Sequence, residues 1–156
     1  MDERIRLFLL DWTVNFIKNR DLISKKIEII EKEKNGFDLY VKYRDKEQYF
    51  LILPTIESFN PLMKRINDDA YFCIVTLNSA GNLNAILKSW KEIIQFKSLS
   101  IIFVNPFSSL DKRWIVFPST HNKISGESSL ELGLKSMFET VEPISEQIMS
   151  ERITKL

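Results

Sequence analysis

Apolar and polar residues alternate most clearly between residues 37 and 54, FDLYVKYRDKEQYFLILP, which predicts two strands joined by the charged turn Arg44 to Glu47. Alternation divides the first strand into one face with Phe37, Leu39, Val41 and Tyr43 and another with Asp38, Tyr40, Lys42 and Arg44. The second strand, Tyr49 to Leu53, is apolar on both faces, so it is predicted to be central and covered on both sides.

The residues before this pair predict a helix and a further strand. Apolar side chains recur at helical spacing in a helix of about five turns that ends near Asn19: Ile5, Phe8, Leu9, Trp12, Phe16 and Ile17. We interpret Trp12 as a core aromatic residue of that stripe. Residues 25–33 alternate loosely, and Asn35-Gly36 is a strong hairpin signal, so three consecutive antiparallel strands are expected.

After Pro54 the pattern changes to alternating helices and buried strands. Asn60 is the expected cap of a short helix over residues 61–66, because Pro61 suits the first helical position. Apolar strands are predicted at 71–77 and 100–104, with one long amphipathic helix over 83–94 between them. A strand, helix and strand of this length indicate a parallel crossover.

The last third of the chain predicts a strand and two helices. Residues 113–118 form an expected edge strand, since Pro118 bounds it. A capping box at Ser128 starts a helix that Pro143 ends, with an inner face of Leu130, Leu134, Met137, Phe138 and Val141. Ile144, Ile148, Met149 and Ile153 predict a terminal helix that docks on the body or meets a partner. We therefore expect one domain over 1–142 and a helical extension over 143–156.

Composition narrows the function classes. The formal charge is +1, so nucleic-acid binding requires a local basic patch. No segment has the roughly 18 unbroken apolar residues of a membrane span, and no basic start marks a signal peptide, so we expect a cytoplasmic protein without a membrane partner. One cysteine, Cys73, and one histidine, His121, exclude a Cys/His zinc cluster. His121 is expected in a polar loop.

The order of helix, three antiparallel strands, short helix, strand, long helix and strand resembles the restriction-endonuclease-like fold of the PD-(D/E)xK nuclease superfamily, from about residue 4 to 104. The resemblance implies an α/β protein with an αβββαβ core, a mixed sheet flanked by helices, and an extra strand and C-terminal helices. Gly36-Phe37-Asp38 matches the Gly-x-Asp of the family motif. Ile52-Leu53-Pro54 stands where that motif has Glu/Gln-x-Lys.

In the family, two carboxylates hold a divalent metal against the scissile phosphate and the lysine orients the attacking water. Isoleucine and proline do neither. The resemblance therefore implies a catalytically degenerate nuclease-fold protein, without a metal cofactor, that binds DNA, RNA or a protein partner. Asp38 is the surviving motif residue.

Two alternatives remain open. In an active nuclease with rearranged residues, Lys42 serves Asp38, Glu28 or Glu57 supplies the second acid, and magnesium is the cofactor. In a structural or assembly subunit, the edge strand and the terminal segment mediate homodimer formation or contact with a protein partner.

Basic residues interleaved with tyrosine mark the expected contacts with nucleic acid. The candidates are Tyr40, Lys42, Arg44 and Lys46 on the hairpin, and Lys88 and Lys91 on the long helix. Further basic residues are Lys64, Arg65, Lys97, Lys112 and Arg113. The simpler interpretation is a charged hairpin that protects a sheet edge.

Overall fold

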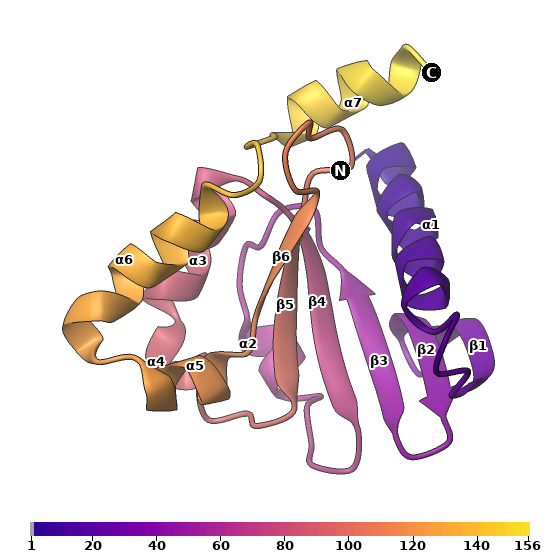
Figure 1. Cartoon of the computed structure of the whole chain (residues 1–156), viewed down its shortest axis with the longest axis horizontal. Helices are drawn as coiled ribbons and strands as arrows, with labels where there is room; N and C mark the ends of the chain where they lie inside the picture. The colour runs from indigo at the N-terminus through magenta and orange to yellow at the C-terminus, as the bar shows by residue number, and fades with distance from the viewer. Residues whose placement is uncertain (1) are drawn as a thin grey trace.

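A computed structural model describes residues 2–156, apart from the side chains of residues 127 and 128. It is an α/β protein with one mixed six-stranded sheet (Figure 1). The strands are β1 (Ile27–Lys34), β2 (Phe37–Tyr43), β3 (Glu47–Ile52), β4 (Tyr71–Leu77), β5 (Leu99–Val104) and β6 (Arg113–Val116). The helices are α1 (Glu3–Arg20), α2 (Asn60–Met63), α3 (Ala80–Lys88), α4 (Trp90–Ile93), α5 (Pro118–Ile124), α6 (Glu127–Phe138) and α7 (Glu146–Thr154).

The strands lie in chain order across the sheet. β1, β2 and β3 pair antiparallel, β3, β4 and β5 pair parallel, and β6 pairs antiparallel with β5. This confirms the three consecutive antiparallel strands, the parallel crossover between β4 and β5, and the edge position of β6. The interior strand β3 contributes side chains to both faces of the sheet, as its apolar run predicted.

The hairpin between β1 and β2 turns at Asn35-Gly36, with φ of +54° and +77°. Both residues adopt the left-handed backbone that a two-residue hairpin requires, which explains the Asn-Gly pair. The predicted alternation in β2 is wrong at its first residue. Phe37 packs on the same side as α3, whereas Leu39, Val41 and Tyr43 pack beneath α1.

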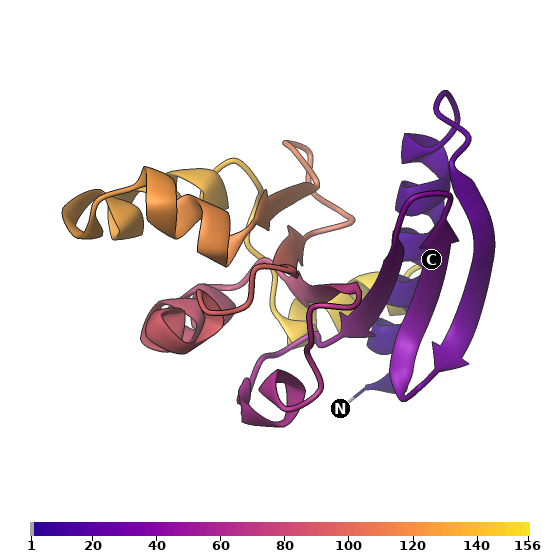
Figure 2. The ribbon, with the colours of Figure 1, turned by 90° about the horizontal axis from the view of Figure 1, so that it is seen from below.

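Helices cover the two faces of the sheet differently (Figure 2). α2, α3, α4 and α6 supply one core, which includes Leu62, Ile86, Trp90 and Leu134. α1 and α7 supply the other, which includes Leu9, Ile17 and Met149. α1 runs beside β2 and β3, and α7 crosses one end of the sheet (Figure 1). On this second face, side chains and not a helix therefore cover the part of the sheet that β4, β5 and β6 form.

Several predicted helix boundaries differ from the structure. The long helix predicted over 83–94 is two helices, because the chain leaves helical geometry at Ser89 and resumes at Trp90. α2 begins at Asn60, which is therefore the first helical residue and not the cap. α6 begins at Glu127 with Gly126 as its cap, so Ser128 lies inside the helix. Met137 is 41% exposed and not on the inner face.

Residues 118–124 form α5, so the prediction that His121 lies in a loop is wrong. Pro118 starts this helix, and its fixed φ suits the first helical turn. The main-chain N–H of Phe117 donates to His121 Nδ1 over 2.9 Å. The imidazole thus caps the start of its own short helix.

The C-terminal segment docks on the body. Ile144 and Met149 are buried with residues of α1, and the Arg4 guanidinium donates to Ser150 Oγ (2.8 Å) and Thr154 Oγ1 (3.1 Å). Of the two predicted arrangements for residues 143–156, the structure has the docked one. Across residues 2–156, no helix combines the length and apolar character that crossing a membrane requires.

Candidate functional site

Asp38 lies where β2 and β3 separate. The main-chain pairing between these strands ends at Leu39 and Phe50. Beyond it, the Asp38 carboxylate takes the place of a main-chain hydrogen-bond acceptor for β3. Its Oδ2 accepts a hydrogen bond from Ile52 N–H over 2.6 Å, and its Oδ1 accepts from Arg6 Nη1 over 2.6 Å. The carboxylate thus joins two strands and a helix.

Arg6 neutralises this carboxylate. Its guanidinium also contacts Glu3, with 2.6 Å between Nη2 and Oε1. The hydrogen bond to Glu3 and the charge of Asp38 raise the pKa of Arg6 above its ordinary value. The side chains of Arg6 and Asp38 are 19% and 15% exposed, so the ion pair is largely shielded. A divalent metal at Asp38 therefore has to displace a guanidinium that already satisfies the charge.

The other candidates for a rearranged nuclease site lie elsewhere. Lys42 Nζ is 3.7 Å from Glu28 Oε1. This pair lies at the far end of β2 from Asp38, since Ile29 is opposite Lys42 whereas Lys34 is opposite Phe37. Glu57 is exposed in the connection before α2. In the part of the chain that the structure describes, no three His, Cys, Asp or Glu side chains are grouped to hold a metal ion.

The hairpin residues expected to contact nucleic acid are largely engaged within the protein. Tyr40 is 3% exposed, its hydroxyl donates to Glu47 Oε1 over 2.8 Å, and Lys34 Nζ lies 3.9 Å from its ring centroid. Burial, followed by the hydrogen bond to Glu47, raises the pKa of Tyr40 to about 12. Its ring is not available to stack on a base. Arg44 donates to the carbonyl of Ser24 over 3.3 Å.

The basic candidates do not gather on one surface. Lys88 and Lys91 are exposed on α3 and α4, which pack on the opposite face of the sheet from α1. The β2–β3 hairpin, which carries the other candidates, lies toward the opposite side of the molecule (Figure 1). Of the six predicted residues, Lys46 is the one that joins a larger basic surface.

That surface is a groove between α1 and β6, which we call the α1–β6 groove. The groove has two chambers, and Phe16 lines both. The upper chamber lies along most of α1 and has a volume of about 570 Å³. The lower chamber lies beside the end of α1 and has a volume of about 300 Å³. The upper chamber is lined by Phe8, Asp11, Trp12, Asn15, Phe16, Asn19, Pro106, Lys112 and Arg113. The groove occupies the part of the sheet face that α1 and α7 leave uncovered.

Aromatic side chains form a ridge along the α1 wall. Phe8, Trp12 and Phe16 are spaced four residues apart and are followed at the same spacing by Arg20, so all four lie on one helix face. Trp12 and Phe16 stack with ring centroids 5.2 Å apart. These three aromatic residues are half-buried, while Ile5, Leu9 and Ile17 fill the core. Trp12 packs against the core beneath α1, as predicted, and its half-buried side chain also forms part of the groove wall.

Two guanidinium groups flank the shared aromatic residue. The Cζ atoms of Arg20 and Arg113 lie 5.0 Å and 4.5 Å from the Phe16 ring centroid. Contact with the ring holds each cation in place without neutralising it. Arg113 comes from β6 and Arg20 from the last turn of α1, so the fold brings together residues 93 positions apart.

The groove is strongly basic although the whole chain is nearly neutral. Five cations line its two chambers: Arg20, Lys46, Lys97, Lys112 and Arg113. Asp11 is the one described carboxylate that lines them, and it contacts Lys32 over 3.8 Å. None of the five cations forms an ion pair with a carboxylate that the structure describes. Lys112 Nζ donates to the carbonyls of Pro106 (3.3 Å) and Ser108 (2.9 Å), which orient the ammonium group but do not neutralise its charge. Cations of this density favour a polyanionic ligand.

The sequence contained two signals for this groove. Lys97, Lys112 and Arg113 were recognised as basic, but their convergence with Arg20 depends on the strand order. The spacing of Phe8, Trp12, Phe16 and Arg20 is visible in the sequence, and only the structure separates that row from the adjacent core stripe.

Two remaining candidates have structural roles. Cys73 is 2% exposed, and burial raises the pKa of its thiol to about 12, which makes it a poor nucleophile at neutral pH. His121 faces its own helix start, with no carboxylate among its described hydrogen-bond partners.

Comparison of the chain with protein-family models, curated proteins and solved structures finds no match.

Proposed function

We propose that the protein binds single-stranded nucleic acid in the α1–β6 groove. The observation that carries this proposal is the convergence of five unpaired cations with the aromatic ridge of α1. Cations track the phosphate backbone, and exposed aromatic faces stack on bases that a single strand leaves unpaired. A double helix hides its base faces, so the ridge favours a single strand.

We further propose that the chain is a catalytically degenerate member of the restriction-endonuclease-like fold. The order of α1, the three antiparallel strands, α2, β4, α3 and β5 supports this proposal. So does the contact of Asp38 with Ile52, which stands at the motif position of the second acid. Arg6 balances Asp38 in place of a metal, which favours binding without cleavage.

Fluorescence anisotropy with a labelled oligothymidylate tests the binding proposal. Replacing both arginines beside Phe16 (Arg20→Gln with Arg113→Gln) should weaken binding by about tenfold or more, because each contact between a cation and a phosphate contributes on the order of 1 kcal/mol. The matched control is Lys88→Gln with Lys91→Gln, which removes the same charge from the opposite face. We expect the control to bind like the parent.

Tryptophan fluorescence provides a second readout. Trp90 and Trp114 are buried, so quenching by the oligonucleotide should come from Trp12 and disappear in Trp12→Phe. Equal loss of affinity in the two double variants contradicts the groove. A polyglutamate chain that binds as tightly as the oligonucleotide shows that the groove binds acidic protein segments instead. Cleavage of single-stranded or branched DNA with magnesium or manganese contradicts the degenerate site.

A further inference from the structure

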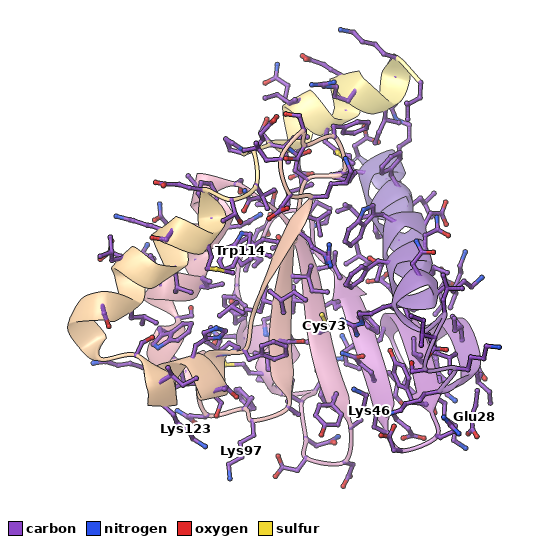
Figure 3. All side chains as sticks on the ribbon, in the orientation of Figure 1. Glu28, Lys46, Cys73, Lys97, Trp114 and Lys123 are labelled. Atoms are coloured by element: carbon purple, nitrogen blue, oxygen red, sulfur yellow. The ribbon has the colours of Figure 1, made fainter. Side chains whose placement is uncertain are left out.

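The lower chamber of the groove differs from the upper one. Its floor is apolar and buried, with Phe50, Cys73, Leu99 and Ile102 each at most 3% exposed. Two half-exposed aromatic residues, Tyr71 and Phe117, also line it, together with Arg20, Lys46 and Lys97. Figure 3 shows Lys46 and Lys97 toward the end of the sheet that carries the β2–β3 turn, with Cys73 higher on β4. The chamber thus combines an apolar interior with three cations.

Beyond these lysines the charge reverses. An adjoining surface depression shares Lys46, Tyr71, Lys97 and Ser98 with the lower chamber, and its remaining lining includes Asp45, Glu47, Asp68 and Asp69. Asp68 and Asp69 are exposed on the turn before β4. Four carboxylates repel a phosphate backbone that continues past Lys46 and Lys97. The groove is therefore basic along α1, and at one end the carboxylates oppose the passage of a phosphate backbone.

We propose that the lower chamber holds the end of the nucleic-acid strand. This inference rests on the proposed function and adds that the ligand is recognised at a terminus. The last base lies between the aromatic side chains over the apolar floor, and the terminal phosphate binds Lys46 and Lys97. A terminal phosphate carries more negative charge than an internal one, so the two lysines that line the chamber attract it more strongly.

The residues of the upper chamber and the position of Tyr71 agree with this arrangement. In the upper chamber, the nucleotides that precede the end of the nucleic-acid strand contact Trp12, Phe16, Lys112 and Arg113. Lys46 Nζ lies 5.3 Å from the Tyr71 ring centroid, so the cation and the aromatic face are adjacent at the proposed terminus. A circular nucleic-acid strand has no terminal phosphate to bind Lys46 and Lys97, so it loses these contacts.

Competition binding with four oligothymidylates of equal length tests the inference: a circular strand, and linear strands with a 5′-phosphate, a 3′-phosphate or two hydroxyl ends. One of the two phosphorylated strands should bind about tenfold tighter than the circle, which corresponds to one strong charged contact. Lys46→Gln with Lys97→Gln should remove this preference, so that the phosphorylated strands bind no more tightly than the circle. Lys88→Gln with Lys91→Gln is the matched control and should keep the preference.

The acidic boundary has a test of its own. Asp68→Asn with Asp69→Asn should raise affinity for the circular strand and narrow its difference from the phosphorylated one, because the backbone can then pass the lysines. Equal affinity of the parent for all four strands overturns terminal recognition and leaves the proposed function intact. Failure of every strand to bind overturns the proposed function, and the inference falls with it.

Discussion

Asp38 illustrates how one residue gains its role from distant partners. The sequence identified it as the surviving half of a catalytic motif. In the structure its two carboxylate oxygens receive hydrogen bonds from Arg6 and from the main chain of Ile52, which hold α1, β2 and β3 together. The carboxylate therefore supports an ion pair and a contact between strands.

Asp38→Asn should destabilise the protein by about 1.5 to 3 kcal/mol, the scale of a hydrogen bond to a charged group in a shielded site. The new amide can still accept from Ile52 N–H, but its NH₂ group then faces the Arg6 guanidinium. Urea unfolding followed by circular dichroism measures the change. This cost exceeds the value of less than about 1 kcal/mol that a purely local role predicts.

The matched control is Glu3→Gln, because Glu3 also contacts Arg6 but is 62% exposed. Exposed ion pairs contribute little, so it should change stability by less than about 1 kcal/mol. The double variant Asp38→Asn with Arg6→Met should lose less than the sum of the single changes. Additive losses would show that the two residues are not coupled.

At the scale of elements, the terminal helix is part of the fold. Met149 of α7 is fully buried beside residues of α1, and Ile144 is buried before the helix begins. The main-chain N–H of Ile144 donates to the carbonyl of Asn78 over 2.9 Å, which anchors the segment to the end of β4. These contacts bury Ile144 and Met149 inside the protein, whereas Ile148 of the same segment stays exposed.

Met149→Ala should therefore destabilise the protein by about 2 to 5 kcal/mol, since it leaves a cavity between α7 and α1. Ile148→Ala is the control on the same helix, because Ile148 is 46% exposed, and it should cost less than about 1 kcal/mol. Thermal or urea unfolding distinguishes the two variants. A large effect of Ile148→Ala with a change in sedimentation mass would favour the assembly role for this segment.

The elements differ in how well the sequence predicted them. β4 spans residues 71–77 as expected, because a short, bounded apolar run has few alternatives. The break at Ser89 was not predicted, since apolar spacing continues through it. Asn78, directly after β4, is fully buried and accepts a 2.7 Å hydrogen bond from Trp114 Nε1, which its polar side chain does not predict. Such a role depends on partners 36 or more residues away.

The candidate site was less predictable than the fold for the same reason. Spacing along a strand suggested that Tyr40 and Lys42 face a ligand, whereas the hairpin uses both internally. Arg20 and Arg113 are far apart in sequence, and they meet at Phe16 because α1 packs on the sheet face toward which Arg113 of β6 extends. Local patterns specify elements, and a surface made by several elements depends on their packing.

At the scale of the molecule, charge is nearly balanced but unevenly distributed. Acidic and basic residues differ by one in the whole chain, while the α1–β6 groove has five cations and one carboxylate. Elsewhere on the surface, pairs such as Lys42 with Glu28 and Lys135 with Glu131 cancel their charges. The field that an approaching polyanion experiences is therefore concentrated at the groove.

This distribution predicts how salt affects binding. If all five groove cations contact phosphates of a single strand, the slope of log K against log salt concentration is about −3.5, because each contact contributes roughly −0.7. Anisotropy titrations between about 50 and 300 mM NaCl measure this slope. Arg20→Gln with Arg113→Gln should make the slope shallower by about 1.4, and Lys88→Gln with Lys91→Gln should leave it unchanged. A parent slope near zero would mean that apolar contacts in the chambers, and not the groove cations, provide the affinity.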